Sequence, residues 1–351
     1  MDNPLRSLKR VAEIIGNGIS QVAEKFDSED PLIITPYRGF ANHEQIFLKG
    51  RVLEDENIFQ GKTESQIRNI INNLKRFETD EIPEANIVIK CNSQEFGCKS
   101  DVEGYFVLNE KWDSPLKEIA NDWLEAEVEL LYPLKENESR ITARAEILFP
   151  SRNSDYGVIT DMDDTVIQTH VTSLFRLKML YTTFLKNAHQ RLPMEGTAEL
   201  FQSFVKGGDG KKKNPIFYVS HSPWNIYDLL EQFLELQRFP KGPILLRDYG
   251  ITPSGHYANH KIESIATILK MYPELPFVLL GDSAEEDADF YIDIAKEFPD
   301  RIKAIYIRQT RDTKNARRIK KLIEGSTHVD AVLVQSSEEI RKHAVAWGLL
   351  S

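Results

Sequence analysis

Short apolar runs alternate with helix-like stretches throughout the second half of this 351-residue chain, and this alternation constrains the fold most. The runs are apolar continuously, whereas a strand with one wet face would alternate apolar and polar residues. Continuously apolar strands are typical of a parallel sheet that helices cover on both faces. We therefore predict a doubly wound, Rossmann-like α/β domain over residues 151–351, with a helical insertion at about 166–214. The predicted strands lie at 156–160, 216–220, 243–246, 277–281 and 303–307.

The region upstream, residues 29–150, has a different pattern. Short runs rich in β-branched and aromatic residues are separated by Gly, Asn, Asp and Pro, which indicates strands joined by turns. The segment 124–130 alternates strictly, so we expect one buried face and one wet face. A capping box at Thr63 and Gln66 predicts one helix in this region. We expect a small β-sandwich-like domain.

Residues 1–28 are predicted to form an amphipathic helix, because apolar residues recur every three or four positions from Leu5 to Val22. The other side of this helix carries Arg6, Lys9 and Arg10. Such a helix can dock on its own domain or lie on a membrane surface, and docking is the favoured interpretation.

The acidic composition limits the partners of the chain. It has 44 Lys and Arg against 54 Asp and Glu, a formal net charge of −10, which disfavours a general nucleic-acid binder. A single phosphate ester is compatible with this charge, because backbone amides and a few cations can hold it at contact distance. Cys91 and Cys98 do not form a redox or zinc motif, and the sequence has no secretory or membrane-spanning segment. We therefore expect a cytoplasmic protein with reduced thiols.

Acidic residues follow the first predicted strand. The sequence Asp161-Met162-Asp163-Asp164-Thr165 places three carboxylates within four positions, where they repel one another unless a cation neutralises them. Oxygen ligands of this kind suit Mg²⁺. A solvated acidic turn that binds no metal has the same composition.

Groups that can hold an anion follow the later strands. Ser220 and His221 end the second predicted strand, and Pro223 stands where a helix can begin, so its free amides can bind an anion. Lys261 opens a further predicted helix and can supply a positive charge.

The fourth predicted strand ends in a second acidic stretch. Asp282 follows Gly281, and Asp287 lies five residues further on. A carboxylate pair here can complete a metal site that begins at Asp161 and Asp163. The carboxyl ends of parallel strands meet at one edge of a sheet. We therefore predict that two carboxylates, a hydroxyl and an ammonium lie close together there, from Asp161, Asp282, Ser220 and Lys261.

This order of motifs, D-x-D-x-T, Ser, Lys and G-D-x-x-x-x-D, is similar to that of the haloacid dehalogenase-like phosphatase superfamily. Within that superfamily, VSHSPWN, HKIESI, FVLLGDSAEEDADFY and AIYIR resemble the catalytic domain of the actin-patch phosphatidate phosphatase family, over roughly residues 151–310. YRGF, GRVL and DVEGYF are similar to the β-rich region of that family and form the weaker match.

The resemblance implies catalysis through an aspartyl phosphate. Asp161 matches the nucleophile that attacks phosphorus, and Asp163 matches the general acid and base. Ser220 matches the residue that hydrogen-bonds the phosphoryl oxygens. Lys261 matches the residue that offsets negative charge on the nucleophile and the phosphoryl group.

The resemblance also implies Mg²⁺ as the cofactor. The Asp161 carboxylate, the Asp163 carbonyl and Asp282 match its ligands. Asp287 is expected to join them, directly or through water.

Two further residues are expected to act on the substrate side. Thr165 is expected to hold the nucleophile loop. His221 stands where many members of the superfamily have a small residue, so it either orients substrate or fills space. The sequence after Asp282 also departs from the Gly-rich, Pro-containing form that is more frequent in the family.

We therefore expect a Mg²⁺-dependent phosphatase that converts phosphatidate, or a related lipid phosphate, to diacylglycerol and phosphate. The motifs do not identify the alcohol, so a soluble small-molecule phosphatase is one alternative, and a non-catalytic binding or scaffold protein is another. The insertion mixes apolar residues with Arg176, Lys178, Lys186 and Arg191, which fits a cap, an interfacial helix or a helix packed on the sheet. Peripheral membrane contact is expected, and nucleic acid is not an expected partner.

Overall fold

The computed structural model divides into two compact units, with the boundary between Pro150 and Ser151. The structure describes residues 31–54, 82–117, 122–134, 140–162, 196–247, 260–283, 286–309, 313–326 and 328–351. The predicted helix over 1–28, the helix after Thr63 and most of the predicted insertion lie outside these ranges. Among the described helices, none is long and apolar enough to cross a membrane.

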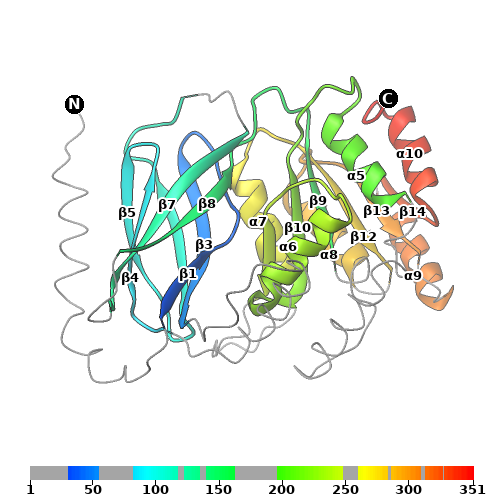
Figure 1. The fold of residues 1–351 in the computed structure, drawn as a ribbon. Helices are drawn as coiled ribbons and strands as arrows, with labels where there is room; N and C mark the ends of the chain where they lie inside the picture. Colours follow the sequence, from blue (N-terminus) through cyan, green and yellow to red (C-terminus); the bar gives the residue numbers. More distant parts are fainter. Residues whose placement is uncertain are drawn as a thin grey trace. The chain divides into compact units, whose positions relative to one another are not determined.

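Eight strands of the first unit form one connected sheet (Figure 1). The order is β1-β3-β2-β8-β7-β4-β5, with β6 paired to β3, and only the β2–β8 pair is parallel. β1 and β2 follow one another along the same edge of β3, and β6 takes the other edge, so β1 lies near β8 because it continues β2. β5 and β6, at opposite ends of the sheet, approach each other at the bridge between Ser100 and Phe106, so the sheet curves over on itself. The predicted sandwich is therefore not confirmed as two separate sheets. The strands are β1 (Leu32–Pro36), β2 (Gly39–Ala41), β3 (Gln45–Glu54), β4 (Asn86–Cys91), β5 (Gln94–Lys99), β6 (Tyr105–Lys111), β7 (Trp123–Tyr132) and β8 (Ile141–Leu148).

Strand β7 confirms the alternation predicted for 124–130. Ala126, Val128 and Leu130 are buried in the core of the first unit. On the opposite face, Glu129 forms ion pairs with Lys90 at 2.7 Å and with Arg140 at 2.7 Å. The strand therefore has one buried apolar face and one face whose charged side chains form ion pairs with neighbouring residues.

Both cysteines are free, and burial suppresses their ionisation. It raises the pKa of the Cys91 thiol to about 11 and that of Cys98 to about 12. Because the thiolate is the reactive form, this shift keeps both thiols protonated and weakly nucleophilic at neutral pH.

The second unit is built on a six-stranded parallel sheet, which confirms the general α/β class. Its order is β11-β10-β9-β12-β13-β14, so the first strand in sequence, β9, lies at the centre between β10 and β12. All five residues of β9 are buried, as continuous apolar runs require. The strands are β9 (Gly157–Asp161), β10 (Ile216–Pro223), β11 (Ile244–Arg247), β12 (Phe277–Asp282), β13 (Ile302–Arg308) and β14 (Ala331–Val334).

Helices connect these strands in two packed sets. α7, α8 and α9 pack side by side in that order, whereas α5 packs against α10 (Figure 1). α5 falls within the predicted helical insertion. The helices are α5 (Thr197–Lys206), α6 (Tyr227–Leu236), α7 (His260–Met271), α8 (Asp287–Glu297), α9 (Thr313–Glu324) and α10 (Ser337–Ala346).

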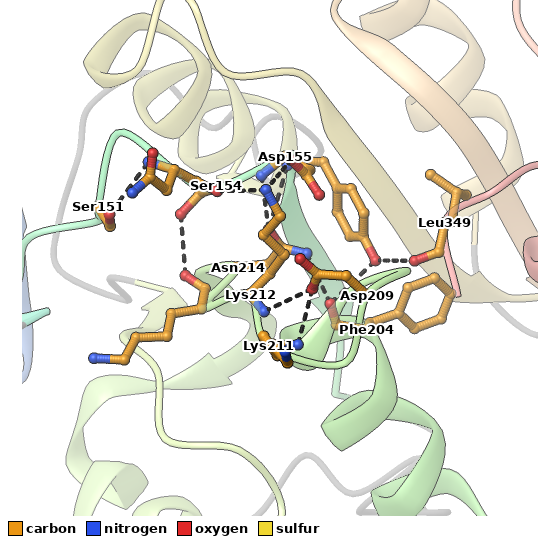
Figure 2. Close-up of polar contacts among 12 residues, drawn as sticks. Ser151, Ser154, Asp155, Phe204, Asp209, Lys211, Lys212, Asn214 and Leu349 are labelled. Carbon is orange, nitrogen blue, oxygen red and sulfur yellow. Dashed lines mark hydrogen bonds and ion pairs between the residues drawn. The ribbon is translucent and has the colours of Figure 1, made fainter. Parts of the chain in front are cut away.

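A closed corner joins α5 to β10 at residues 207–214 (Figure 2). Asp209 Oδ1 accepts hydrogen bonds from the backbone N–H groups of Lys211 and Lys212, at 2.8 and 3.1 Å. The Asn214 side chain accepts from the backbone N–H of Asp155 at 2.9 Å, and the Lys212 ammonium lies 2.8 Å from the Asp155 carboxylate. The corner therefore secures the amino ends of β9 and β10, the edge opposite to the predicted site.

Candidate active site

The residues predicted to carry chemistry lie at the carboxyl ends of the three central parallel strands. Asp161 ends β9, and Asp282 ends β12. Ser220 lies in β10 directly after Val219, the last β10 residue that pairs with β9. The strand register places Asp161 beside Val219 of β10. All three polar side chains are buried. Groups from segments that are about 60 residues apart in sequence are thus brought to one edge of the sheet.

Lys261 is the centre of the buried ion pairs. It lies in the first turn of α7, its side chain is 1% exposed, and its Nζ is 2.6 Å from Asp161 Oδ1. The same Nζ lies 2.9 Å from Asp287 Oδ1. A buried ammonium is tolerated only with such partners, because its desolvation costs several kcal/mol. The structure therefore brings Lys261 together with Asp161 and Asp287, and its catalytic role stays a prediction.

Asp287 has a protein partner for each carboxylate oxygen. Oδ1 faces Lys261, and Oδ2 accepts a hydrogen bond from the backbone N–H of Asp282 at 3.1 Å. Asp287 is fully buried and begins α8, where the helix dipole favours a carboxylate. These contacts give Asp287 a positioning role for Lys261 and for the loop at Asp282. Its predicted contact with a metal ion stays a prediction.

Gly281 leaves the space that Asp287 occupies. A Cβ at position 281 would lie 2.5 Å from Asp287 Oδ2 and 2.8 Å from Cε2 of Tyr291. Tyr291 in turn donates a hydrogen bond to the carbonyl of Leu280 at 3.0 Å. Burial, and then the negative charge of Asp287, raise the pKa of Tyr291 well above its usual range, so its hydroxyl stays protonated. The glycine is required by this packing.

Ser220 and His221 lie on β10 as it leaves the sheet. Ser220 is fully buried and its Oγ accepts a hydrogen bond from the backbone N–H of Ser222 at 2.9 Å. β10 continues to Pro223, and a single 3₁₀ turn follows before α6 begins at Tyr227. Helical structure therefore begins directly after Pro223, as predicted, although its first turn is 3₁₀ and α6 follows it. His221 is partly exposed beside Ser220.

Arg308 is a cation of this region to which sequence reasoning gave no role. It ends β13 and is paired in register with Asp282. Its guanidinium donates to Ser337 Oγ at 2.8 Å and to Thr197 Oγ1 at 3.3 Å. Burial lowers the pKa of Arg308, and the charge of Asp282 opposes that shift. The sequence did contain a signal for Arg308, because it directly follows the fifth predicted strand (303–307), just as Asp161 follows the first.

Oxygen donors for a hard cation are present at this edge. Asp161 and Asp282 end neighbouring strands, and a pair of buried carboxylates is stabilised by a divalent cation. Within the described ranges, no three His, Cys, Asp or Glu side chains are grouped as a metal site. Asp163 and Thr165, predicted to belong to the ligand set and the nucleophile loop, lie outside the described residues. The donors that are described fit Mg²⁺ in their chemistry, and Asp161 and Asp282 are the side chains that would hold it.

A known family model matches most of the α/β unit. Residues 156–309 match the family model described as "Phosphatidate phosphatase APP1, catalytic domain". The α/β unit resembles this catalytic domain. The similarity predicted from the spaced motifs is therefore confirmed, and the matched range holds Asp161, Ser220, Lys261, Asp282 and Asp287.

Two fungal proteins are similar over most of the chain. Phosphatidate phosphatase APP1 of Saccharomyces cerevisiae is 30% identical over 248 residues, which cover 67% of this chain and 40% of that protein. An uncharacterized protein of Schizosaccharomyces pombe is 29% identical over 242 residues, which cover 67% of this chain and 37% of that protein. The chain thus spans about two fifths of the length of these relatives.

Among solved structures, a calcium-binding mutant of β-glucuronidase 2 from Bacteroides uniformis aligns with 90% of this chain and 38% of its own. The sequence identity is 12% and the TM-score is 0.26. A likeness at this level supports no conclusion on fold or function.

Proposed function

We propose that the α/β unit is a haloacid dehalogenase-type catalytic domain, in which Mg²⁺ assists the hydrolysis of phosphatidate to diacylglycerol and phosphate. The observation that carries the proposal is the buried Lys261 ammonium between Asp161 and Asp287 at the carboxyl edge of the sheet. The match of residues 156–309 to a phosphatidate phosphatase catalytic domain supports the same assignment. The central position of β9 and the two packed sets of helices support the doubly wound arrangement.

In the proposed first step, an Asp161 carboxylate oxygen attacks phosphorus. The bond between phosphorus and the ester oxygen breaks, and the alcohol leaves with a proton from Asp163. Lys261, 2.6 Å from Asp161, offsets the negative charge that gathers on the carboxylate and the phosphoryl oxygens. Ser220 is proposed to hydrogen-bond those oxygens, and His221 and Thr165 to contact the substrate.

In the second step, water attacks phosphorus of the aspartyl phosphate. Asp163 accepts the proton of the water, phosphate leaves, and the Asp161 carboxylate is regenerated, so each group returns to its starting state. Mg²⁺, when bound, supplies positive charge for the phosphoryl oxygens. Asp161, Asp282 and the Asp163 carbonyl are the proposed ligands, and Asp287 holds Lys261 in place.

The lipid nature of the substrate rests on the name of the yeast relative and of the matched domain. A soluble phosphomonoester is the second candidate, because the site residues bind the phosphoryl group and not the alcohol. A cytoplasmic location with peripheral membrane contact is part of the proposal.

The test of the nucleophile is Asp161→Asn. This change preserves the size of the side chain and removes its nucleophilic oxygen charge, so phosphate release should fall by about 10⁴-fold or more. Asp155→Asn is the matched control, because Asp155 lies just before the other end of β9 and is exposed. An Asp161→Asn variant that is folded and retains the wild-type rate would refute the mechanism.

The cofactor and the substrate are tested in the same assay. Chelation of divalent cations should abolish turnover, and Mg²⁺ should restore it. Phosphate release from phosphatidate in mixed micelles is then compared with release from a panel of soluble esters. Activity on the soluble esters alone would reject phosphatidate as the substrate in favour of a soluble ester. A folded protein without activity on either class would favour the scaffold alternative.

A further inference from the structure

The strand and helix that follow the site loops carry an unusual concentration of positive charge. Between Arg301 and Lys321 the sequence has nine Lys and Arg residues and one Asp, a local balance of +8 in a chain of net charge −10. The described part of this segment includes β13 and most of α9. The positive charge is not all on one surface, because Arg301 and Arg308 donate hydrogen bonds within the unit.

The exposed side of α9 is cationic. Arg317, Lys320 and Lys321 are exposed, whereas Ala316 and Ile319 are buried against the rest of the unit. At about 100° per residue, the three exposed cations fall within roughly 100° of the helix circumference. We call these three residues the α9 basic face. α9, drawn in orange, lies beside β13 and β14 in Figure 1.

The α9 basic face is available for a partner. In the part of the chain that the structure describes, Arg317 and Lys321 form no ion pair. Lys320 is 71% exposed and its ammonium lies 4.0 Å from Glu324, a distance at which an exposed pair contributes little. By contrast, Arg318 is held by Asp289 at 2.8 Å and is not part of the face.

The first turns of α9 are attached to the candidate active site. The side-chain amide of Asn315 donates a hydrogen bond to the carbonyl of Ser283, the residue directly after Asp282. The Arg318–Asp289 ion pair joins the next part of α9 to the first turn of α8, which also carries Asp287. A surface that contacts the α9 basic face therefore lies next to the carboxyl edge of the sheet.

We propose that the α9 basic face docks the protein on an anionic lipid bilayer and so presents phosphatidate to the site. This inference rests on the proposed function. Three clustered cations suit a bilayer, because each Lys or Arg near an anionic surface adds a modest attraction that falls off with salt. A nucleic acid fits less well, because the α9 basic face lies next to a site whose proposed substrate is a lipid.

The test measures binding to vesicles of phosphatidylcholine with and without phosphatidylserine, a lipid that is not the proposed substrate. The 351-residue chain should bind the vesicles that contain phosphatidylserine, and less so at high salt. The variant R317Q/K320Q/K321Q should bind them on the order of 100-fold more weakly. Its activity on phosphatidate in neutral mixed micelles should be unchanged.

The matched control is K206Q/K211Q/K213Q. It also removes three charges from exposed lysines, but at the end of α5 (Lys206) and in the corner that follows it (Lys211 and Lys213), next to the amino ends of the strands. This control should bind vesicles as the wild type does. Equal losses in both variants, or wild-type binding by the α9 variant, would overturn the proposed face.

Two further outcomes separate this inference from the proposed function. Vesicle binding that depends on α9, together with no phosphate release from phosphatidate, supports the docking face and rejects the substrate. Binding to a DNA duplex through the same three residues, without binding to vesicles, would overturn the lipid assignment.

Discussion

Replacing Asp287 by Asn tests whether this buried carboxylate positions Lys261. The two carboxylate oxygens accept hydrogen bonds from the Lys261 ammonium at 2.9 Å and from the Asp282 N–H at 3.1 Å. Asn has a similar shape but only one oxygen. Whichever way the amide is turned, its NH₂ group therefore faces one of these two donors, in a position that water does not reach.

The cost follows from these two contacts. One unsatisfied buried donor costs about 1–3 kcal/mol, and loss of a charge beside Lys261 adds to it, although Asp161 still neutralises the ammonium. We expect a total of about 2–4 kcal/mol, which for a unit of about 200 residues lowers the midpoint of thermal unfolding by roughly 5–15 °C. Lys261 then loses its contact with Asp287 and is held less firmly beside Asp161, so kcat should fall by about 10- to 100-fold.

Thermal unfolding and phosphate release are measured for this variant beside Asp293→Asn. Asp293 lies on the same helix, its side chain is 65% exposed, and its ion pair with Lys296 is worth little. The control should therefore unfold and turn over as the wild type does. If Asp287→Asn loses no more stability and activity than this control, the positioning role is refuted.

Two other perturbations test the packing and the charges. Gly281→Ala places a Cβ 2.5 Å from Asp287 Oδ2, so it should lower the free energy of unfolding by about 1–3 kcal/mol. It should also reduce phosphate release, as Asp287→Asn does, and wild-type kinetics would show that the close approach has no role. In the first unit, the neighbouring Arg140 and then Lys90 lower the pKa of Glu129 to about 2. The folded state favours ionised Glu129, so its stabilisation is present above pH about 4.5 and is lost as the pH falls towards 2. Thermal melts over this range should show a smaller pH dependence for Glu129→Gln than for wild type or Glu125→Gln, and equal slopes in all three would contradict the assignment.

The sequence alone predicted the α/β class of the second unit, and it selected several residues that the structure brings to one edge of the sheet. Continuous apolar runs predict parallel strands, because only a strand covered on both faces needs them, and Asp161, Ser220 and Asp282 follow from their places at strand ends. These are local properties, which a linear pattern records.

The tertiary structure decided which of these groups touch. Lys261 and Asp287 are 26 positions apart, and the sequence between them contains no signal that the two side chains meet, because their contact depends on how α7 and α8 pack. The same holds for Arg308, whose partners Thr197 and Ser337 begin helices far away in sequence. The curvature of the first sheet depends on pairing between distant strands. Burial and strand pairing depend on the whole fold. They bring motif residues that are distant in sequence into contact as buried ion pairs.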